Sequence, residues 1–386
     1  MKKIIIACRA YYPDVAGGGE ISTKTLSETL VALGFDVTVI AISNSNKKEV
    51  VDNVAVHRVA YKNVYWSYEN KNMGPIKKIA WHVIDSNNVL IEGELKRLLK
   101  EIKPDILITS TIEDVSSVIW KVAKAQHIRT VHILRSYSLL CPNANMFKED
   151  NCNTRCGLCK VITLPKRINS KYVDDVVGIS HFVADKHIEN GYFPNAKKHV
   201  IYNICLDYVA DERVYNGFAT KKIKIGYLGR VHKTKGIDLI FDAVSQLDSQ
   251  QKAMIEIEVA GTGSEDYISE LKTLAAKQAV TCHFHGNRKA NEFLDSLDLL
   301  IVPSKWNEPF GRVLIESMGR NVPVAAKTVG GIPEILSENT AFLFDDAEGL
   351  TQVINKYLRS EIAFNFNLDE FKTDNIIRKW DVLLSN

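Results

Sequence analysis

The feature that most constrains the fold of this chain is a regular alternation of short apolar runs with amphipathic segments. Continuous apolar runs are typical of strands that are buried on both faces of a parallel sheet. In the first half, largely apolar segments predict strands at residues 2–8, 37–40, 54–59, 105–109, 130–134, 176–180 and 200–203. The segments 21–33, 76–100 and 114–126 between them have helical periodicity. This order predicts a doubly wound α/β domain.

The alternation begins again after residues 206–220, a polar and irregular segment that we interpret as a linker. Strands are predicted at 222–228, 255–260, 281–285, 299–302 and 322–326, and helices at 236–247, 266–277, 290–296 and 366–384. At 386 residues, the chain is too long for a single core. Two α/β domains of similar size predict a ligand site in a cleft at the carboxyl ends of their strands.

Composition limits where the protein works. The apolar run at 4–8 is too short for the core of a signal peptide, and no run approaches the roughly 20 residues of a spanning helix. Seven cysteines without an export signal predict reduced thiols and a cytoplasmic location. Residues 1–205 carry 28 Lys and Arg against 20 Asp and Glu, which predicts an anionic partner for this half. Scattered lysines on solvated helices are the simpler explanation.

One turn combines an anion site with acids. The apolar strand at 299–302 ends at Pro303, and we expect a helix to start near Pro309, where a missing N–H costs nothing. Backbone N–H groups at such a helix start attract phosphate. Glu308 precedes this start and Glu316 follows it. The competing explanations are a helix-capping role for Glu308 and an ion-pair ladder of Glu316 with Arg312 and Arg320.

Two further strand ends carry phosphate-binding chemistry. Arg230 and Lys235 leave the end of the strand at 222–228, and a guanidinium with an ammonium suits a diphosphate leaving group. Gly18 and Gly19 precede the helix after the first strand, so that their backbone can approach a phosphate closely. The spacing of this loop is not that of a dinucleotide fingerprint. A solvated lysine loop and a flexible turn are the respective alternatives.

Several short motifs occur in a fixed order along the chain. They are Gly229-Arg230-x4-Lys235-Gly236, Ala260-Gly261-x-Gly263, Gly286, Val302-Pro303-Ser304, Glu308-x7-Glu316 and Gly330-Gly331-x-Pro333-Glu334. Each is weak alone, but the ordered set resembles the GT4 family of retaining glycosyltransferases. The resemblance implies the GT-B fold, in which two Rossmann-like domains face a central cleft and a C-terminal helix crosses back. Residues 1–205 with about 366–386 would form the acceptor-side domain, and residues 206–365 the nucleotide-sugar domain.

The resemblance also implies roles for individual residues. Glu308 would lie against the donor sugar, Glu316 would hold the ribose hydroxyls, and Arg230 with Lys235 would grip the diphosphate. The other donor-binding positions that it implies are Gly18, Gly19, Gly229, Gly263, Arg288, Phe310, Gly311 and Arg312. The sequence departs from the family at Arg135-Ser136, where many relatives have His-Asp. Arg135 could stabilise donor phosphate or bind an anionic acceptor, but it cannot act as a base at neutral pH.

The cysteines Cys141, Cys152, Cys156 and Cys159 form an unusual group, three of them within eight residues. Four thiolates suit tetrahedral zinc and also suit an iron–sulfur cluster. A metal-free loop of reduced thiols is the alternative. A structural zinc ion here would be separate from catalysis.

We therefore expect a glycosyltransferase of the hexosyltransferase class that uses a nucleotide-diphosphate sugar, retains configuration and needs no metal for catalysis. The expected acceptor is a saccharide, or a lipid-linked saccharide of bacterial O-antigen or capsule synthesis, which would make the protein peripheral to the membrane. No nucleic-acid partner is expected. Two alternatives stay open: a sugar-nucleotide epimerase of the same architecture, and a non-catalytic interaction protein that depends on a metal in the cysteine loop.

Overall fold

The computed structural model describes residues 1–15, 17–69, 73–205 and 222–385. The chain divides into two compact units. Unit 1 comprises Met1–Lys148, Cys152–Ile204 and Asp374–Asn386, and unit 2 comprises Glu149–Asn151 and Cys205–Thr373. The linker predicted at 206–220 lies outside the described residues.

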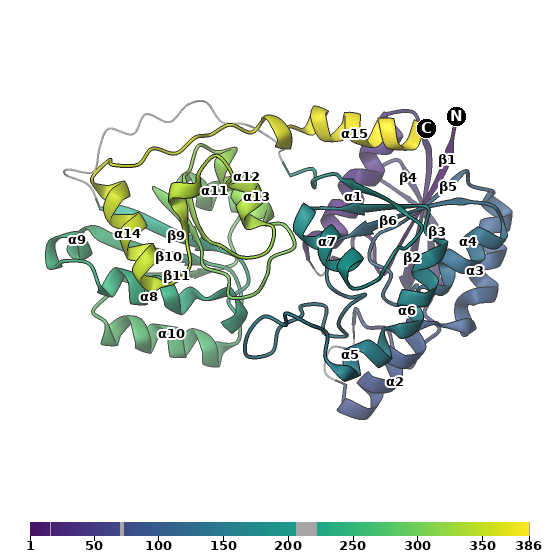
Figure 1. The fold of residues 1–386 in the computed structure, drawn as a ribbon, viewed down its shortest axis with the longest axis horizontal. Coiled ribbons are helices and arrows are strands. Elements are labelled where there is room, and N and C mark those ends of the chain that lie inside the picture. The colour runs from purple at the N-terminus through teal and green to yellow at the C-terminus, as the bar shows by residue number, and fades with distance from the viewer. Residues whose placement is uncertain (16, 70–72, 206–221, 386) are drawn as a thin grey trace. The chain divides into compact units, whose positions relative to one another are not determined.

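Unit 1 is built on an eight-stranded sheet with the order β3-β4-β2-β1-β5-β6-β7-β8 (Figure 1). The strands are β1 Lys3–Cys8, β2 Asp36–Ser43, β3 Lys47–Val51, β4 Val54–Ala60, β5 Ile106–Thr109, β6 Arg129–Leu134, β7 Asp175–Gly178 and β8 Lys197–Val200. All pairs are parallel except β3 with β4. Residues 4–8 of β1 are fully buried, as a strand covered by helices on both faces requires.

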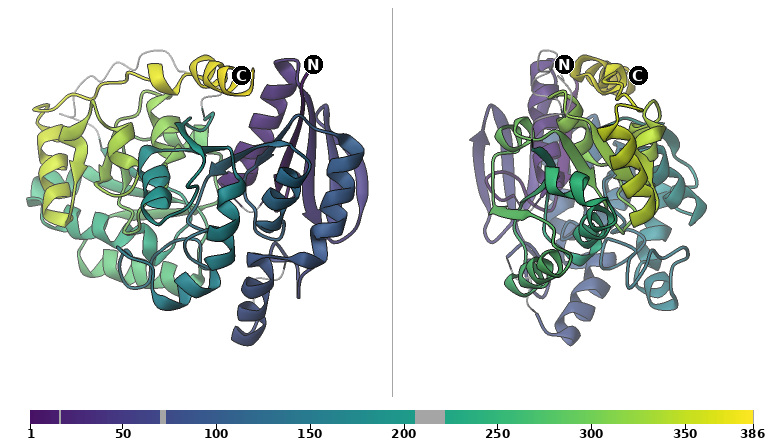
Figure 2. Two further views of the ribbon diagram at one scale, coloured as in Figure 1. Left: turned by 45° about the vertical axis from the view of Figure 1, so that its right-hand side comes forward. Right: turned by 90° about the vertical axis from the view of Figure 1, so that its left-hand side faces the viewer.

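Helices connect these strands and cover the sheet. They are α1 Gly18–Ala32, α2 Pro75–Ser86, α3 Val89–Ile102, α4 Val118–Ala125, α5 Gly157–Ile162, α6 Leu164–Asn169 and α7 His181–Glu189. The chain's last helix, α15 Thr373–Ser385, also belongs to this unit almost entirely. It lies beside the start of β1 (Figure 2), where Lys2 Nζ donates to the carbonyl oxygens of Leu384 at 2.8 Å and Ser385 at 2.7 Å. Its apolar stripe buries Ile376, Trp380 and Leu384.

Unit 2 contains a wholly parallel six-stranded sheet with the order β11-β10-β9-β12-β13-β14. The strands are β9 Ile223–Leu228, β10 Ile255–Ala260, β11 Cys282–Gly286, β12 Leu299–Val302, β13 Val324–Lys327 and β14 Leu343–Phe344. The helices are α8 Ile237–Ser245, α9 Ser249–Met254, α10 Glu265–Lys277, α11 Ala290–Asp295, α12 Arg312–Met318, α13 Ile332–Ile335 and α14 Ala347–Leu358. One apolar cluster joins the sheet to α8, α10 and α14.

Some sequence expectations of element bounds were wrong. The helical region 76–100 is two helices, which Asn87 and Asn88 separate, with Asn88 as the N-cap of α3. The strand expected at 200–203 is β8, which ends at Val200. The helix expected from Pro309 begins at Arg312, because Gly311 precedes it with φ 124°. The last helix begins at Thr373 rather than near 366.

None of the described helices is both long and apolar enough to cross a membrane.

A deeply buried ion pair in unit 1 joins two helices, with Lys166 Nζ 2.8 Å from Asp85 Oδ2. The other oxygen of Asp85 accepts from the backbone N–H of Asp114 at 2.7 Å. The pair therefore connects α2 and α6 with the loop that follows β5.

Replacing Lys166 with methionine should destabilise the protein strongly, because it leaves the Asp85 carboxylate buried without its cation. Breaking a buried pair in this way costs about 3–5 kcal/mol. The matched control is Lys124→Met, which removes the exposed pair with Asp174 and should cost less than about 1 kcal/mol. Urea unfolding of both variants measures the two effects. Equal shifts of the two unfolding midpoints would contradict this assignment.

Candidate active site

Glu308 lies at the centre of the polar groups that follow β12. It is only 9% exposed, and its Oε1 accepts three hydrogen bonds. The donors are Lys235 Nζ at 2.5 Å, Ser304 Oγ at 2.6 Å and Trp306 Nε1 at 3.0 Å. Because all three bonds end on one oxygen, they hold Oε1 in a defined position. Lys235 also places its ammonium 5.2 Å from the centre of the Trp306 ring.

Two glycine-rich turns hold the loop that carries Glu308. Gly236 has φ 68°, and a Cβ atom on it would lie 2.2 Å from the carbonyl oxygen of Pro303. Gly330 has φ 60°, and a Cβ on it would lie 2.1 Å from the carbonyl oxygen of Glu308. The N–H of Gly331 donates to that same oxygen at 2.8 Å. Backbone therefore packs against backbone at Pro303, where the loop begins, and at Glu308, which only glycine permits.

Asn151 supports the same loop, and the sequence contained no signal that could have found it. Its side-chain amide donates to the carbonyl oxygen of Lys305 at 2.7 Å, and its Oδ1 accepts from the N–H of Asn307 at 2.7 Å. These two bonds satisfy backbone groups of the turn between Ser304 and Glu308. A polar residue beside Cys152 looks in sequence like any loop asparagine.

The loops after β9, β10 and β11 pack together through their backbones. The N–H of Gly229 donates to Ala260 at 3.0 Å, and the N–H of Gly261 donates to Gly286 at 2.7 Å. Val231 forms a bridge with Gly263. These backbone contacts are a structural reason for glycine at positions 229 and 263, and this reason does not depend on ligand binding. Arg230 is exposed here, and Arg288 is exposed in the loop after β11.

Tyr227 holds the backbone of the loop that carries Arg230. The hydroxyl of Tyr227 donates to the carbonyl oxygen of Arg230 at 2.8 Å. Burial raises the pKa of Tyr227 far above its usual range, and the nearby charge of Glu308 raises it further. Tyr227 is therefore a neutral hydrogen-bond donor that holds the backbone from which the Arg230 side chain extends.

The ion pairs around α12 agree only in part with the ladder of Arg312, Glu316 and Arg320 that the sequence offered as an alternative. Phe310 is buried, and Arg312 is the first helical residue after the N-cap Gly311. Arg312 lies 3.3 Å from Glu316, as the ladder alternative predicted. Arg320, however, pairs with Asp295 on α11 through two hydrogen bonds. The side chain of Glu316 is partly exposed and pairs with Arg312. It is therefore accessible to a ligand hydroxyl.

In unit 1, Gly18 and Gly19 are the first two residues of α1, and the N–H of Gly17 donates to Glu20 Oε2 at 3.0 Å. A Cβ on Gly19 would make only an ordinary contact with Thr111, at 3.5 Å. Packing therefore does not require glycine at this position, in contrast to Gly236 and Gly330.

Arg58 holds the loop between β1 and α1 in place, which sequence reasoning missed. This buried guanidinium on β4 donates to the carbonyl oxygens of Tyr11 at 3.2 Å and Tyr12 at 2.8 Å. It also pairs with Asp14 at 3.1 Å and Glu49 at 2.5 Å. The available signal was an arginine within the strand expected at 54–59, where every other residue except His57 is apolar.

Arg135 follows β6 and is held on two sides. Its Nε donates to Ser110 Oγ at 2.8 Å, and its Nη1 donates to Asn203 Oδ1. His132, the nearest histidine, is buried within β6 with Nδ1 2.8 Å from Thr109 Oγ1. Burial lowers the pKa of His132 to about 3, so it is a neutral core residue. The cationic group at this strand end is therefore Arg135.

Cys159 has Cys141 and Cys156 as neighbours in unit 1. Burial, followed by these neighbours, raises the pKa of Cys159 to about 12, whereas the backbone of Cys159 lowers that of Cys156. Cys141, Cys156 and Cys159 are free cysteines. Zinc binding by Cys141, Cys152, Cys156 and Cys159 stays a prediction.

Both halves of the chain match models of known protein families. Residues 16–204 match the family model described as "Glycosyltransferase Family 4", and residues 209–371 match "Glycosyl transferases group 1". An uncharacterized 42.6 kDa protein from the cps region of Klebsiella pneumoniae is 33% identical over 347 residues, which are 89% of this chain and 90% of that protein. The lipopolysaccharide core biosynthesis mannosyltransferase LpsB of Rhizobium meliloti is 30% identical over 153 residues, 37% of this chain and 43% of that protein.

Among solved structures, the Anabaena protein Alr3699/HepE in complex with UDP and glucose has a TM-score of 0.71. The match covers 100% of both chains at 18% sequence identity. Together with the two parallel sheets described above, this likeness shows the architecture. The chain is a member of glycosyltransferase family 4 with the GT-B fold.

Proposed function

We propose that this enzyme transfers a sugar from a nucleotide-diphosphate donor to a saccharide acceptor, with retention of configuration. The observation that carries the proposal is the Glu308 carboxyl group, held on one oxygen by Lys235, Ser304 and Trp306. A carboxylate so fixed at the end of a central strand can stabilise positive charge that develops on a sugar. The complex of Alr3699/HepE with UDP and glucose supports a uridine-nucleotide donor.

The cations at the end of β9 would serve the leaving group. Lys235 and Arg230 lie in the loop next to Glu308, and each can form charge-assisted hydrogen bonds with phosphate oxygens. We propose that they neutralise the departing diphosphate, which other enzymes achieve with a divalent metal. Glu316 would accept the ribose hydroxyls, and the exposed Arg288 would lie near the base.

Retention would then follow from substitution on one face of the sugar. The leaving phosphate would help to remove the acceptor proton, while Glu308 positions the sugar. We propose this route rather than a covalent glycosyl–enzyme. Trapping a sugar covalently on Glu308 would overturn it.

The acceptor belongs to unit 1 in this proposal. Arg135, between Ser110 and Asn203, is a cation suited to an anionic saccharide or to donor phosphate. The Klebsiella relative lies in a cps region, and LpsB acts in lipopolysaccharide core biosynthesis. We therefore propose a role in bacterial surface polysaccharide synthesis, with a lipid-linked acceptor reached from the membrane surface.

Glu308→Gln should separate catalysis from donor binding. The amide keeps the size of the side chain but removes its negative charge, so turnover should fall by about 10²–10³-fold, as for other groups that stabilise a transition state. UDP affinity, measured calorimetrically, should stay within about threefold. Release of UDP from UDP-sugars, with and without acceptor extracts, measures turnover. Unchanged turnover in Glu308→Gln would exclude this role.

Lys235→Met should weaken UDP binding by about 10–100-fold, the equivalent of about 1.5–3 kcal/mol for a hydrogen bond to a charged group. The control is Lys233→Met, two residues away, because Lys233 pairs with Glu270 at 3.0 Å. This control should bind UDP about as well as the native chain. Equal weakening in both variants would mean that general positive charge, rather than Lys235 itself, contributes the affinity.

Membrane association can be tested by flotation with vesicles. We expect binding to phosphatidylglycerol vesicles at low salt but not to phosphatidylcholine vesicles, because the first half of the chain carries the excess of basic residues. Salt should release the protein, since the screening length falls from about 30 Å at 0.01 M to about 3 Å at 1 M. Absence of binding to the anionic vesicles at low salt would contradict peripheral attachment through charge.

A further inference from the structure

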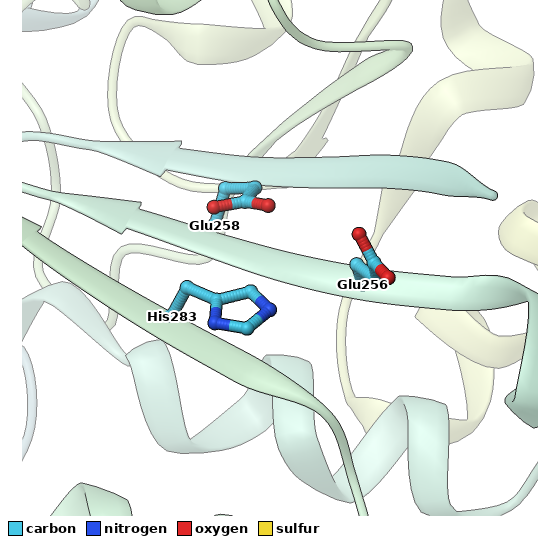
Figure 3. Close-up of side chains that lie close together, drawn as sticks. All are labelled: Glu256, Glu258 and His283. Atoms are coloured by element: carbon cyan, nitrogen blue, oxygen red, sulfur yellow. The ribbon is translucent and has the colours of Figure 1, made fainter.

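A group of metal-ligand side chains lies on unit 2, apart from the residues assigned to the donor. Glu256 and Glu258 are two residues apart on β10, so both point to the same face of the sheet. His283 extends from the neighbouring edge strand β11 toward them (Figure 3). One ligand atom from each of the three side chains lies within 4.8 Å of the other two.

The pairing of the two strands produces this arrangement. Glu258 is in register with His283. An irregularity in the ladder follows Val259, and it leaves His285 as an extra residue on β11. The Nε2 atom of His285 is hydrogen-bonded to Glu258 Oε2, and its ring packs against Phe293 of α11 at a centroid distance of 6.0 Å. A carboxylate held by a histidine in this way has the outer support that metal-ligating side chains usually have.

Burial and charge also favour a cation. Glu258 is only 6% exposed, Glu256 is half-buried and His283 is exposed, so the group opens to solvent on the His283 side. Glu258 has His285 beside it, which carries a positive charge only when it is protonated. Lys222 Nζ is 4.0 Å from Glu256 Oε1 and donates to the carbonyl oxygen of Ala253 at 2.6 Å, and Lys224 on β9 is in register with Glu256. Because the contact of Lys222 with Glu256 is at the upper limit of ion-pair distance, Lys222 compensates this carboxylate only in part.

We propose that Glu256, Glu258 and His283 bind one divalent transition-metal ion of the zinc class, with water completing its coordination. One imidazole and two carboxylates suit Zn²⁺ or Co²⁺ better than Mg²⁺, which prefers oxygen ligands alone. Ligand atoms at about 2.0–2.2 Å from zinc in a tetrahedral site lie about 3.3–3.6 Å apart, so the three side chains would have to close in slightly from their present separation of up to 4.8 Å. His285 would position Glu258 without binding the ion.

The ion would cross-link two neighbouring strands whose carboxyl ends lead to predicted donor loops. β10 is followed by Gly261 and Gly263, and β11 ends at Gly286 and is followed by Arg288. Its role would be structural, and the site is separate from Glu308 and Lys235. Metal binding can therefore be established or refuted whether or not the proposed transfer reaction is correct.

The test must separate this site from the cysteines. Equilibrium dialysis of the full chain with Zn²⁺, followed by elemental analysis, should be done on the Cys156→Ser/Cys159→Ser variant. We expect one zinc ion per chain, which is lost in the further variant His283→Asn. His285→Asn should weaken binding by about 10–100-fold, as expected for an outer-shell partner. Retention of the ion in the His283→Asn variant would overturn the proposal, as would the absence of zinc from the double cysteine variant.

His199→Asn is the matched control, because His199 pairs with Asp175 at 2.9 Å on the edge strand of the other sheet but belongs to no such group. It should retain the ion. If the cysteine variant fails to fold, Co²⁺ spectra of the native chain serve instead. Cobalt at Glu256, Glu258 and His283 gives d–d bands that disappear in His283→Asn. Bands of thiolate–cobalt charge transfer that persist unchanged in His283→Asn, with no other cobalt signal, would refute the site.

Discussion

The candidate site depends on the three hydrogen bonds that converge on Glu308 Oε1. Their donors come from two segments far apart in sequence: Lys235 follows β9, whereas Ser304 and Trp306 follow β12. β9 and β12 are adjacent in the sheet, so their carboxyl ends deliver both segments to one place. The carboxyl group cannot rotate without breaking bonds to both segments. In the proposed reaction, a charge whose surroundings are already organised would need little rearrangement as positive charge developed on the sugar.

The strands could be predicted from sequence wherever burial on both faces makes a run apolar. The five-residue run at 4–8 in β1 and the four-residue run of β12 are of this kind. β3 could not be predicted, because it is an edge strand whose residues are all partly or fully exposed, so its sequence Lys-Lys-Glu-Val-Val has no apolar pattern. The start of α12 was misjudged for a different reason. Proline at 309 permits a helix start, but the positive φ of Gly311 delays it to Arg312.

Candidate site residues could be predicted from the sequence where the residue type itself determines the chemistry. They could not be predicted where a residue's role depends on contacts with residues distant in sequence. Glu308, Lys235 and Arg230 stand at strand ends that the sequence already indicated. Asn151 acquires its role only because its loop reaches the backbone at Lys305 and Asn307. The packing of Gly236 and Gly330 against carbonyl oxygens likewise depends on neighbours distant in sequence. Sequence shows that these residues are glycines, but not whether a ligand or the backbone requires them.

The position of α15 has a consequence for how the chain acquires its structure during synthesis. Residues 222–373 form most of unit 2 as one continuous segment, whereas unit 1 requires residues 374–386 from the end of the chain. The ribosome therefore releases nearly all of unit 2 before the last helix of unit 1 exists. Until then the apolar surface that Ile376, Trp380 and Leu384 cover in the finished protein has no partner from this helix. The domain that begins first is the one that is completed last.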